Sequence, residues 1–110
     1  MEGLELKCFE LISNVGNAKS LFVEAIREAK EGNFDEADLK IKEGEEFFIQ
    51  GHRVHAQIIQ CEANGQIIES SLLLIHSEDQ LMSAETIKLM ADELIDSYKT
   101  IYELKDNQGD

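Results

Sequence analysis

The sequence predicts an all-α protein in which three helices pack as an antiparallel bundle. Proline is absent from the 110 residues and aromatic residues make up only 6% of them, a composition that suits long helices better than strands. Apolar residues recur at three- and four-residue spacing through three long stretches, which is the pattern of amphipathic helices. We therefore expect one helical domain over residues 1–110.

The first predicted helix covers residues 3–31. Its regularly spaced apolar residues are Leu4, Cys8, Leu11, Ile12, Val15, Ala18, Phe22, Ala25, Ile26 and Ala29. Gly32 follows and supplies a left-handed C-terminal stop. Gly16 lies inside the helix at a cost of about 1 kcal/mol relative to alanine, and we expect it to allow a neighbouring helix to pack closely.

The second predicted helix covers residues 34–63 and ends at Asn64 and Gly65. Asn33 is a candidate N-cap, and Glu36 at the third helical position completes a capping-box arrangement. One stripe alternates by three and four residues and predicts left-handed bundle packing: Phe34, Ala37, Ile41, Gly44, Phe48, Gly51, His55 and Ile58. Because two members of this stripe are glycines, we expect a neighbouring helix to approach closely.

The third predicted helix covers residues 70–104, with Ser70 or Ser71 as its cap, and it carries two adjacent apolar stripes. The first stripe is Leu73, Ser77, Gln80, Ala84, Ile87, Ala91, Leu94, Tyr98 and Ile101, and the second is Leu72, Ile75, Asp79, Met82, Thr86 and Leu89. One small bundle does not bury both stripes. We expect one stripe to face the helices of its own subunit and the other to meet symmetry mates, in a number that the pattern does not fix.

The charge balance limits the classes of partner. The formal net charge is −13, from 23 acidic and 10 basic residues, and such a surface repels nucleic-acid phosphates and anionic lipids. No apolar run approaches a membrane span, so we expect neither nucleic-acid binding nor direct membrane insertion. Cys8 and Cys61 show no metal-ligand spacing and are typical of free thiols, which favours a cytoplasmic location.

The most informative stretch is residues 72–82, which read Leu-Leu-Leu-Ile-His-Ser-Glu-Asp-Gln-Leu-Met. Asp79 lies within the second apolar stripe, where a carboxylate is costly unless it is paired, hydrogen-bonded or bound to a cation. His76 lies three residues earlier, beside that stripe. The residues alone leave two interpretations of each side chain. His76 is either a hydrogen-bonded structural histidine or a nucleophile, and Asp79 either accepts a helix-to-helix hydrogen bond or binds a metal ion.

This stretch resembles the active-site segment of the enzyme IIA component of the lactose/cellobiose-type phosphoenolpyruvate-dependent sugar phosphotransferase system. The family's segment reads roughly His-Ala-Gln-Asp-His-Leu-Met, and residues 76–82 match its first His, its Asp and its Leu-Met. The other similar segments are Phe9-Glu10 with Gly16, Ala18 and Ser20, residues 29–34 with Ala37, and His52 with residues 62–65. The resemblance thus covers nearly the whole chain at matching spacing.

The resemblance implies a phosphocarrier, a kind of phosphotransferase. His76 is then the nucleophile that accepts a phosphoryl group from the histidine-containing phosphocarrier protein. It passes the group to a cysteine of the cognate IIB component during disaccharide uptake. The resemblance also implies a homotrimer in which Asp79 of each subunit points inward onto one shared divalent cation. Oxygen ligands favour a hard ion such as magnesium or calcium, and of these we expect magnesium.

Three positions depart from the family pattern. Gln80 replaces the second histidine and keeps hydrogen-bonding capacity, although it does not titrate. Glu78 replaces a glutamine, and its negative charge is expected to disfavour the phosphorylated form modestly. His55 also stands at a glutamine position, either as a structural histidine or as a partial replacement for the lost one. These departures leave two alternatives: a non-catalytic trimeric interaction or regulatory module, and a cation-binding bundle built on Asp79.

Overall fold

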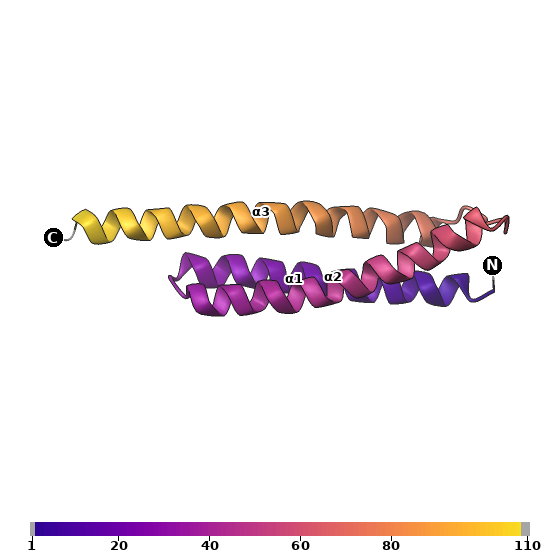
Figure 1. The fold of residues 1–110 in the computed structure, drawn as a ribbon, viewed down its shortest axis with the longest axis horizontal. Coiled ribbons are helices and arrows are strands. Elements are labelled where there is room, and N and C mark those ends of the chain that lie inside the picture. The colour runs from indigo at the N-terminus through magenta and orange to yellow at the C-terminus, as the bar shows by residue number, and fades with distance from the viewer. Residues whose placement is uncertain (1, 109–110) are drawn as a thin grey trace.

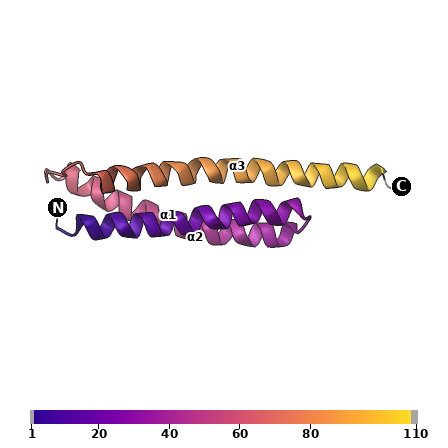
Figure 2. The same cartoon turned by 180° about the vertical axis from the view of Figure 1, so that it is seen from behind.

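A computed structural model describes residues 2–108, which form three α-helices and no strand. The helices are α1 (Leu4–Lys30), α2 (Phe34–Ala63) and α3 (Leu72–Gln108). Helices α1 and α2 run side by side in opposite directions, and α3 lies along the pair (Figure 1, Figure 2). The predicted all-α class with three helices is therefore confirmed. The predicted domain also includes residues 1 and 109–110, which lie outside the described part of the chain.

The helix ends are set by local chemistry that the sequence anticipated in part. Gly32 and Gly65 take left-handed conformations, with φ of 82° and 91°, and both follow helix ends as predicted. Helix α3 begins later than residue 70 because the Ser71 hydroxyl accepts a hydrogen bond from the Leu74 amide at 3.1 Å, which makes Ser71 its cap. It also continues to Gln108, beyond the predicted end at residue 104.

The capping box predicted at the start of α2 is wrong. The Asn33 side chain makes no capping hydrogen bond to α2. Its amide instead donates to Glu28 Oε2 at 3.0 Å, across the turn that joins α1 to α2. The Asn33 side chain therefore binds the end of α1 and does not cap the start of α2.

The glycines of α2 let α1 approach closely, as the sequence predicted. All eight members of the predicted α2 stripe are buried or half-buried. A β-carbon on Gly44 would lie 2.5 Å from Cε1 of the buried Phe22 ring, and one on Gly51 would lie 2.8 Å from Val15 Cγ1. The same expectation is wrong for Gly16, because a β-carbon there meets nothing within 4 Å among the described residues.

The two predicted stripes of α3 differ in their burial within the chain. The first stripe faces the bundle over most of its length: Ser77, Ala84 and Ala91 are fully buried on it, whereas Leu94 and Ile101 are exposed. Leu74, Leu81 and Ile95, which neither stripe included, are buried beside it. Every member of the second stripe is exposed: Leu72, Ile75, Asp79, Met82, Thr86 and Leu89. Helix α3 packs mainly on α1 and touches α2 far less, so this side of α3 has no neighbour within the described chain.

The far end of α3 extends past the turn between α1 and α2 (Figure 1). Tyr102 anchors it there, because its hydroxyl donates to the Lys30 carbonyl at 3.0 Å and its ring meets Phe34 edge-on at 5.5 Å between centroids. Across residues 2–108, no helix has both the length and the apolarity needed to span a membrane.

Candidate functional site

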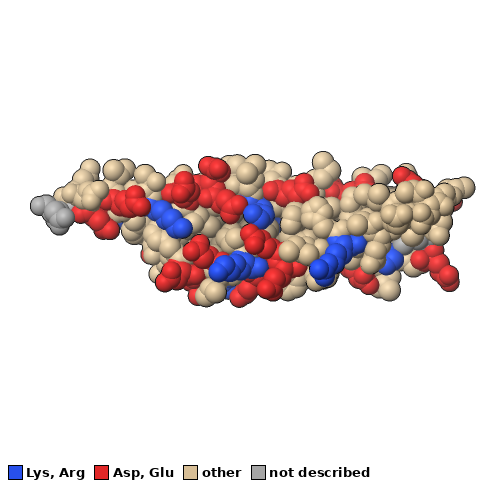
Figure 3. Space-filling model, in the orientation of Figure 1, with Lys and Arg blue, Asp and Glu red and all other residues tan. Residues whose placement is uncertain are grey.

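His76 lies in the second turn of α3, and its side chain is exposed. The ring borders a shallow hollow of about 550 Å³ that is also lined by Leu72 and Leu73. The surrounding end of the molecule, where α2 passes to α3, carries a broad uncharged area in Figure 3, whereas acidic side chains gather along the middle of that face. Ile67 in the link and Leu72 are 84% and 83% exposed. The imidazole is therefore accessible to another macromolecule and is flanked by apolar surface.

Asp79 is exposed one turn further along α3, among the apolar residues of the second stripe. Its neighbours on that stripe, Ile75 and Met82, are 58% and 65% exposed. Within residues 2–108, Asp79 makes no ion pair, and no group of three or more His, Cys, Asp or Glu side chains lies close enough to hold a metal ion. A metal site that uses Asp79 would therefore need further protein ligands from outside residues 2–108 of the same chain.

Gln80 lies one turn after His76 and is held from the neighbouring helix. Lys19 of α1 donates from Nζ to Gln80 Oε1 at 2.7 Å, and both side chains are half-buried in the contact between α1 and α3. Sequence reasoning singled out Gln80 but missed Lys19. Nothing in the spacing along α1 pairs residue 19 with residue 80, because that pairing depends on how the two helices are aligned.

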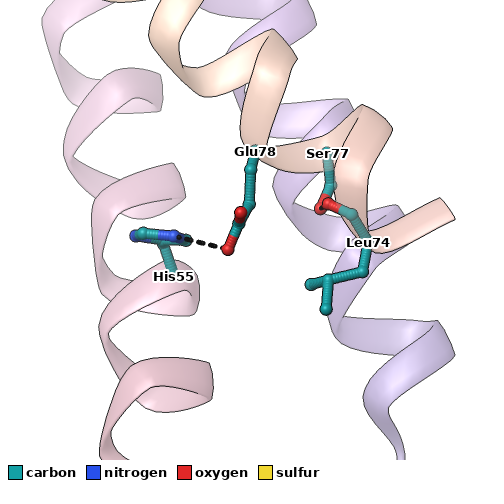
Figure 4. Close-up of polar contacts among 4 residues, drawn as sticks. All are labelled: His55, Leu74, Ser77 and Glu78. Carbon is teal, nitrogen blue, oxygen red and sulfur yellow. Dashed lines mark hydrogen bonds and ion pairs between the residues drawn. The ribbon is translucent and has the colours of Figure 1, made fainter. Parts of the chain in front are cut away.

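Glu78 is turned toward α2. Its Oε1 lies 3.3 Å from His55 Nε2, and the two side chains point toward one another across the gap between α2 and α3 (Figure 4). Successive helical residues are about 100° apart, so Glu78 projects from nearly the opposite side of α3 to His76. The Glu78 charge is therefore directed away from the phosphoryl-accepting group, which lowers its expected effect on the phosphorylated form. Within the chain, His55 of α2 is paired with Glu78, on the side of α3 that faces away from His76.

Ser77 satisfies its buried hydroxyl locally. Its Oγ donates to the Leu74 carbonyl at 2.7 Å within the same helix (Figure 4). Beyond this turn, His52 and Glu45 of α2 each contact α3. His52 Nε2 lies 3.3 Å from Glu85 Oε1, and Glu45 Oε1 lies 3.5 Å from Lys88 Nζ. These contacts fix α2 against α3 and leave the His76 turn uncovered.

Comparison with known proteins identifies the family. The family model for the lactose/cellobiose-specific IIA subunit of the sugar phosphotransferase system matches residues 6–99. The chain belongs to this IIA family. Its relatives include the oligo-β-mannoside-specific EIIA component of Bacillus subtilis strain 168, which is 42% identical over 92 residues, 84% of each chain. The family resemblance carried by residues 76–82 is thereby confirmed.

Solved IIA structures share the fold. The cellobiose-specific enzyme IIA of Bacillus anthracis aligns with a TM-score of 0.90 and 42% identity over 94% of each chain. A chitobiose IIA chain solved in complex with HPr aligns with a TM-score of 0.81 and 27% identity, over 93% of this chain and 99% of that one. The present chain is accordingly a phosphocarrier of the lactose/cellobiose IIA type.

Proposed function

We propose that His76 carries the phosphoryl group, accepting it from the histidine-containing phosphocarrier protein and passing it to a cysteine of a IIB component during disaccharide uptake. The observation that supports this assignment is an exposed imidazole beside an apolar hollow, within the segment that matches the family motif. The other two histidines face carboxylates across the helix contacts instead. The complex of a related IIA chain with HPr supports the choice of donor.

The chemistry that His76 performs is two in-line displacements. In the first, a ring nitrogen of neutral His76 attacks the phosphorus of the donor phosphohistidine, so that one N–P bond forms as the donor N–P bond breaks. In the second, the IIB thiolate attacks the same phosphorus. An S–P bond then forms as the His76 N–P bond breaks, and the freed imidazole regains its neutral state. Both partners need an approach along one line, which an exposed ring allows.

The second stripe of α3 supports assembly into a homotrimer. Its apolar members are exposed in one chain, and Leu72, Met82 and Leu89 are 83%, 65% and 62% accessible. An exposed and mainly apolar stripe of this kind is costly in water and is typical of an interface. We propose that the stripes of three copies meet around a common axis.

Asp79 fits a shared divalent cation in that assembly. Its carboxylate is the one charged group within the stripe from Leu72 to Leu89, and it has no ion-pair partner among residues 2–108. Three such carboxylates brought together repel one another, and a hard cation such as magnesium relieves the repulsion by accepting their oxygens. In this proposal the cation holds subunits together and takes no part in phosphoryl transfer.

A labelling experiment tests the assignment of His76. The chain is incubated with the histidine-containing phosphocarrier protein, phosphoenolpyruvate and the enzyme that phosphorylates the carrier, and protein-bound phosphate is measured at alkaline pH, where phosphohistidine persists. We expect one labelled site in the unaltered chain and in His52→Ala and His55→Ala, and none in His76→Ala. Label that persists in folded His76→Ala overturns the assignment. A chain that takes no label at all supports the non-catalytic interaction module instead.

A further inference from the structure

We propose that the Gln80 side-chain amide donates a hydrogen bond to the phosphoryl group on His76, and that Lys19 is the positioning residue that orients this amide. This inference rests on the proposed role of His76 and adds two residues to it. It concerns the position at which this chain departs from the histidine of the family motif.

The contact with Lys19 fixes which way the Gln80 amide faces. A lysine ammonium has three N–H donors and no acceptor, so the Gln80 atom that it meets at 2.7 Å must be the carbonyl oxygen. The amide nitrogen, with its two N–H donors, is then directed to the other side. Without Lys19, the two ends of the amide exchange freely, because nothing else among the described residues hydrogen-bonds the Gln80 side chain.

Helix geometry brings the oriented amide to the His76 turn. Residues four apart on a helix have β-carbons about 5–6 Å apart on the same face. Side chains in helices also lean toward the N-terminal turn, so Gln80 extends over the turn that holds His76. A phosphoryl group on the imidazole adds three acceptor oxygens to this space. The Gln80 N–H groups are neutral donors that meet these anionic acceptors, which gives charge-assisted hydrogen bonds.

The other polar residues of the segment do not fill this role. Glu78 is engaged with His55 on the side of α3 that faces α2. Asp79 offers only acceptor oxygens when ionised, so it repels a phosphoryl group rather than binding it. Lys19 also brings a positive charge to the side chain of Gln80, which is one helical turn from His76. In a chain with a net charge of −13, that charge favours the phosphorylated form.

The test measures the phosphotransfer equilibrium between the free chain and the free phosphocarrier protein. Docking of the two proteins changes the rate of transfer but not this equilibrium constant, so the measurement reports on the phosphoryl group alone. The variants are Gln80→Leu, which removes the donors, and Lys19→Met, which removes the ammonium. Lys19→Arg keeps both donor and charge. Lys7→Met is the matched control, because Lys7 donates to Gln57 between α1 and α2 and the charge change is the same.

We expect Gln80→Leu to shift the equilibrium about tenfold toward unphosphorylated chain, since a hydrogen bond to a charged group is lost. Lys19→Met should shift it in the same direction by a smaller factor that still exceeds twofold, since the amide keeps its donors but loses its fixed orientation and the nearby positive charge. Lys19→Arg and Lys7→Met should stay within about twofold of the unaltered protein. In the amide nitrogen NMR spectrum, the Gln80 side-chain signal should move on phosphorylation, and Lys19→Met should reduce that movement. Circular dichroism checks that every variant stays helical.

The outcomes separate this inference from the role of His76. If the unaltered chain takes label and Lys19→Met or Gln80→Leu reaches the same equilibrium, the inference is overturned and the role of His76 stands. An unmoved Gln80 signal on phosphorylation also overturns it. If the unaltered chain takes no label, the role of His76 fails and the inference fails with it. If Lys19→Met and Lys7→Met shift the equilibrium equally, the shift is an effect of net charge, and the positioning role of Lys19 is excluded.

Discussion

Gly44, Gly51 and Gly16 show how differently one residue type acts along these helices. Gly44 lies where the buried Phe22 ring passes α2, and Gly51 lies against Val15, so both are required by the approach of α1. Gly16 faces open space in the described chain. Helical glycines carry the same entropic cost in each case, about 0.5–1 kcal/mol relative to alanine. What differs is whether the neighbouring helix leaves room for a methyl group.

A pair of alanine substitutions tests this distinction. Gly44→Ala places a β-carbon 2.5 Å from a buried ring, and overpacking outweighs the gain in helix propensity. We expect a net loss of about 1–2 kcal/mol in the free energy of unfolding. Gly16→Ala should instead raise that free energy by about 0.5–1 kcal/mol. Urea unfolding of both variants measures the difference, and equal stabilities would show that the Phe22 ring moves aside without cost.

At the scale of the element, the surface of α3 has three parts with different contacts. One side buries Ser77, Ala84 and Ala91 against the bundle, and the opposite side exposes the second stripe. Polar residues between these sides align α3 with its neighbours. Lys88 is the clearest case, because its Nζ lies 3.0 Å from Asp92 Oδ2 on α3 and 3.5 Å from Glu45 Oε1 on α2.

Because of the ion pairs of Lys88, part of the free energy of unfolding changes with pH in the alkaline range. The hydrogen bond to Asp92, together with the attraction of Asp92 and Glu45, raises the pKa of Lys88 above its ordinary value of 10.5, against the opposing effect of burial. A raised pKa means that the stabilisation is complete below 10.5 and is lost as pH rises through the higher folded value. Lys88→Met should therefore cost up to about 1 kcal/mol at pH 7 and nothing above the folded pKa.

Urea unfolding at several alkaline pH values measures this dependence. Lys42→Met is the control, because Lys42 is exposed on α2 and makes no ion pair within residues 2–108. The difference between Lys88→Met and the unaltered chain should shrink as pH rises, whereas the Lys42→Met difference should stay small throughout. A Lys88→Met deficit that is independent of pH would attribute the effect to packing of the lysine stem.

At the scale of the whole molecule, the chain is an elongated bundle 66 Å long whose α3 projects beyond the other two helices. The α2 glycines Gly44 and Gly51 let α1 pack closely against α2, while the second stripe of α3 stays uncovered in the described chain. A bundle of this size gains limited stability from its own core. Burial of the stripe between copies would add to that stability.

Breaking the stripe should dissociate the proposed trimer. Met82 is 65% exposed in the single chain, and Met82→Glu places a charge where three apolar stripes are expected to meet. Light scattering coupled to size exclusion should give the mass of three chains for the unaltered protein and a smaller mass for Met82→Glu. Leu39→Glu is the control, because Leu39 is 53% exposed on α2 away from the stripe. A single-chain mass for the unaltered protein at micromolar concentration rejects the trimer.

Removing the Asp79 charge should remove the response to cations. A cation that binds only the folded assembly raises its unfolding temperature, so magnesium should stabilise the unaltered protein and a chelator should reverse this. Asp79→Asn should abolish the response, and Asp79→Leu should keep or strengthen assembly because it removes the repulsion as well as the site. Asp38→Asn, altered on an exposed residue of α2, should respond like the unaltered protein. An undiminished response in Asp79→Asn contradicts the shared site.

Local pattern by itself determined the three helices and the left-handed glycines at their ends, and it narrowed the cap of α3 to Ser70 or Ser71. These features depend on neighbours within a few residues, so spacing and residue type suffice to predict them. The same applies to the segment around His76, where the family motif is contiguous. The Asn33 cap failed because the side chain found a competing partner on α1, Glu28.

Only the tertiary structure decided which side chains meet across helices. Lys19 with Gln80, His55 with Glu78, and Lys88 with Glu45 join residues from different helices. These pairings depend on the alignment and rotation of one helix against another, and a rotation by one residue turns a side chain by about 100°. Apolar spacing tolerates small changes of alignment that a hydrogen bond does not. The sequence therefore predicts the His76 turn. The packing of α1 and α2 against α3 decides which polar side chains of α3 are paired with a neighbouring helix.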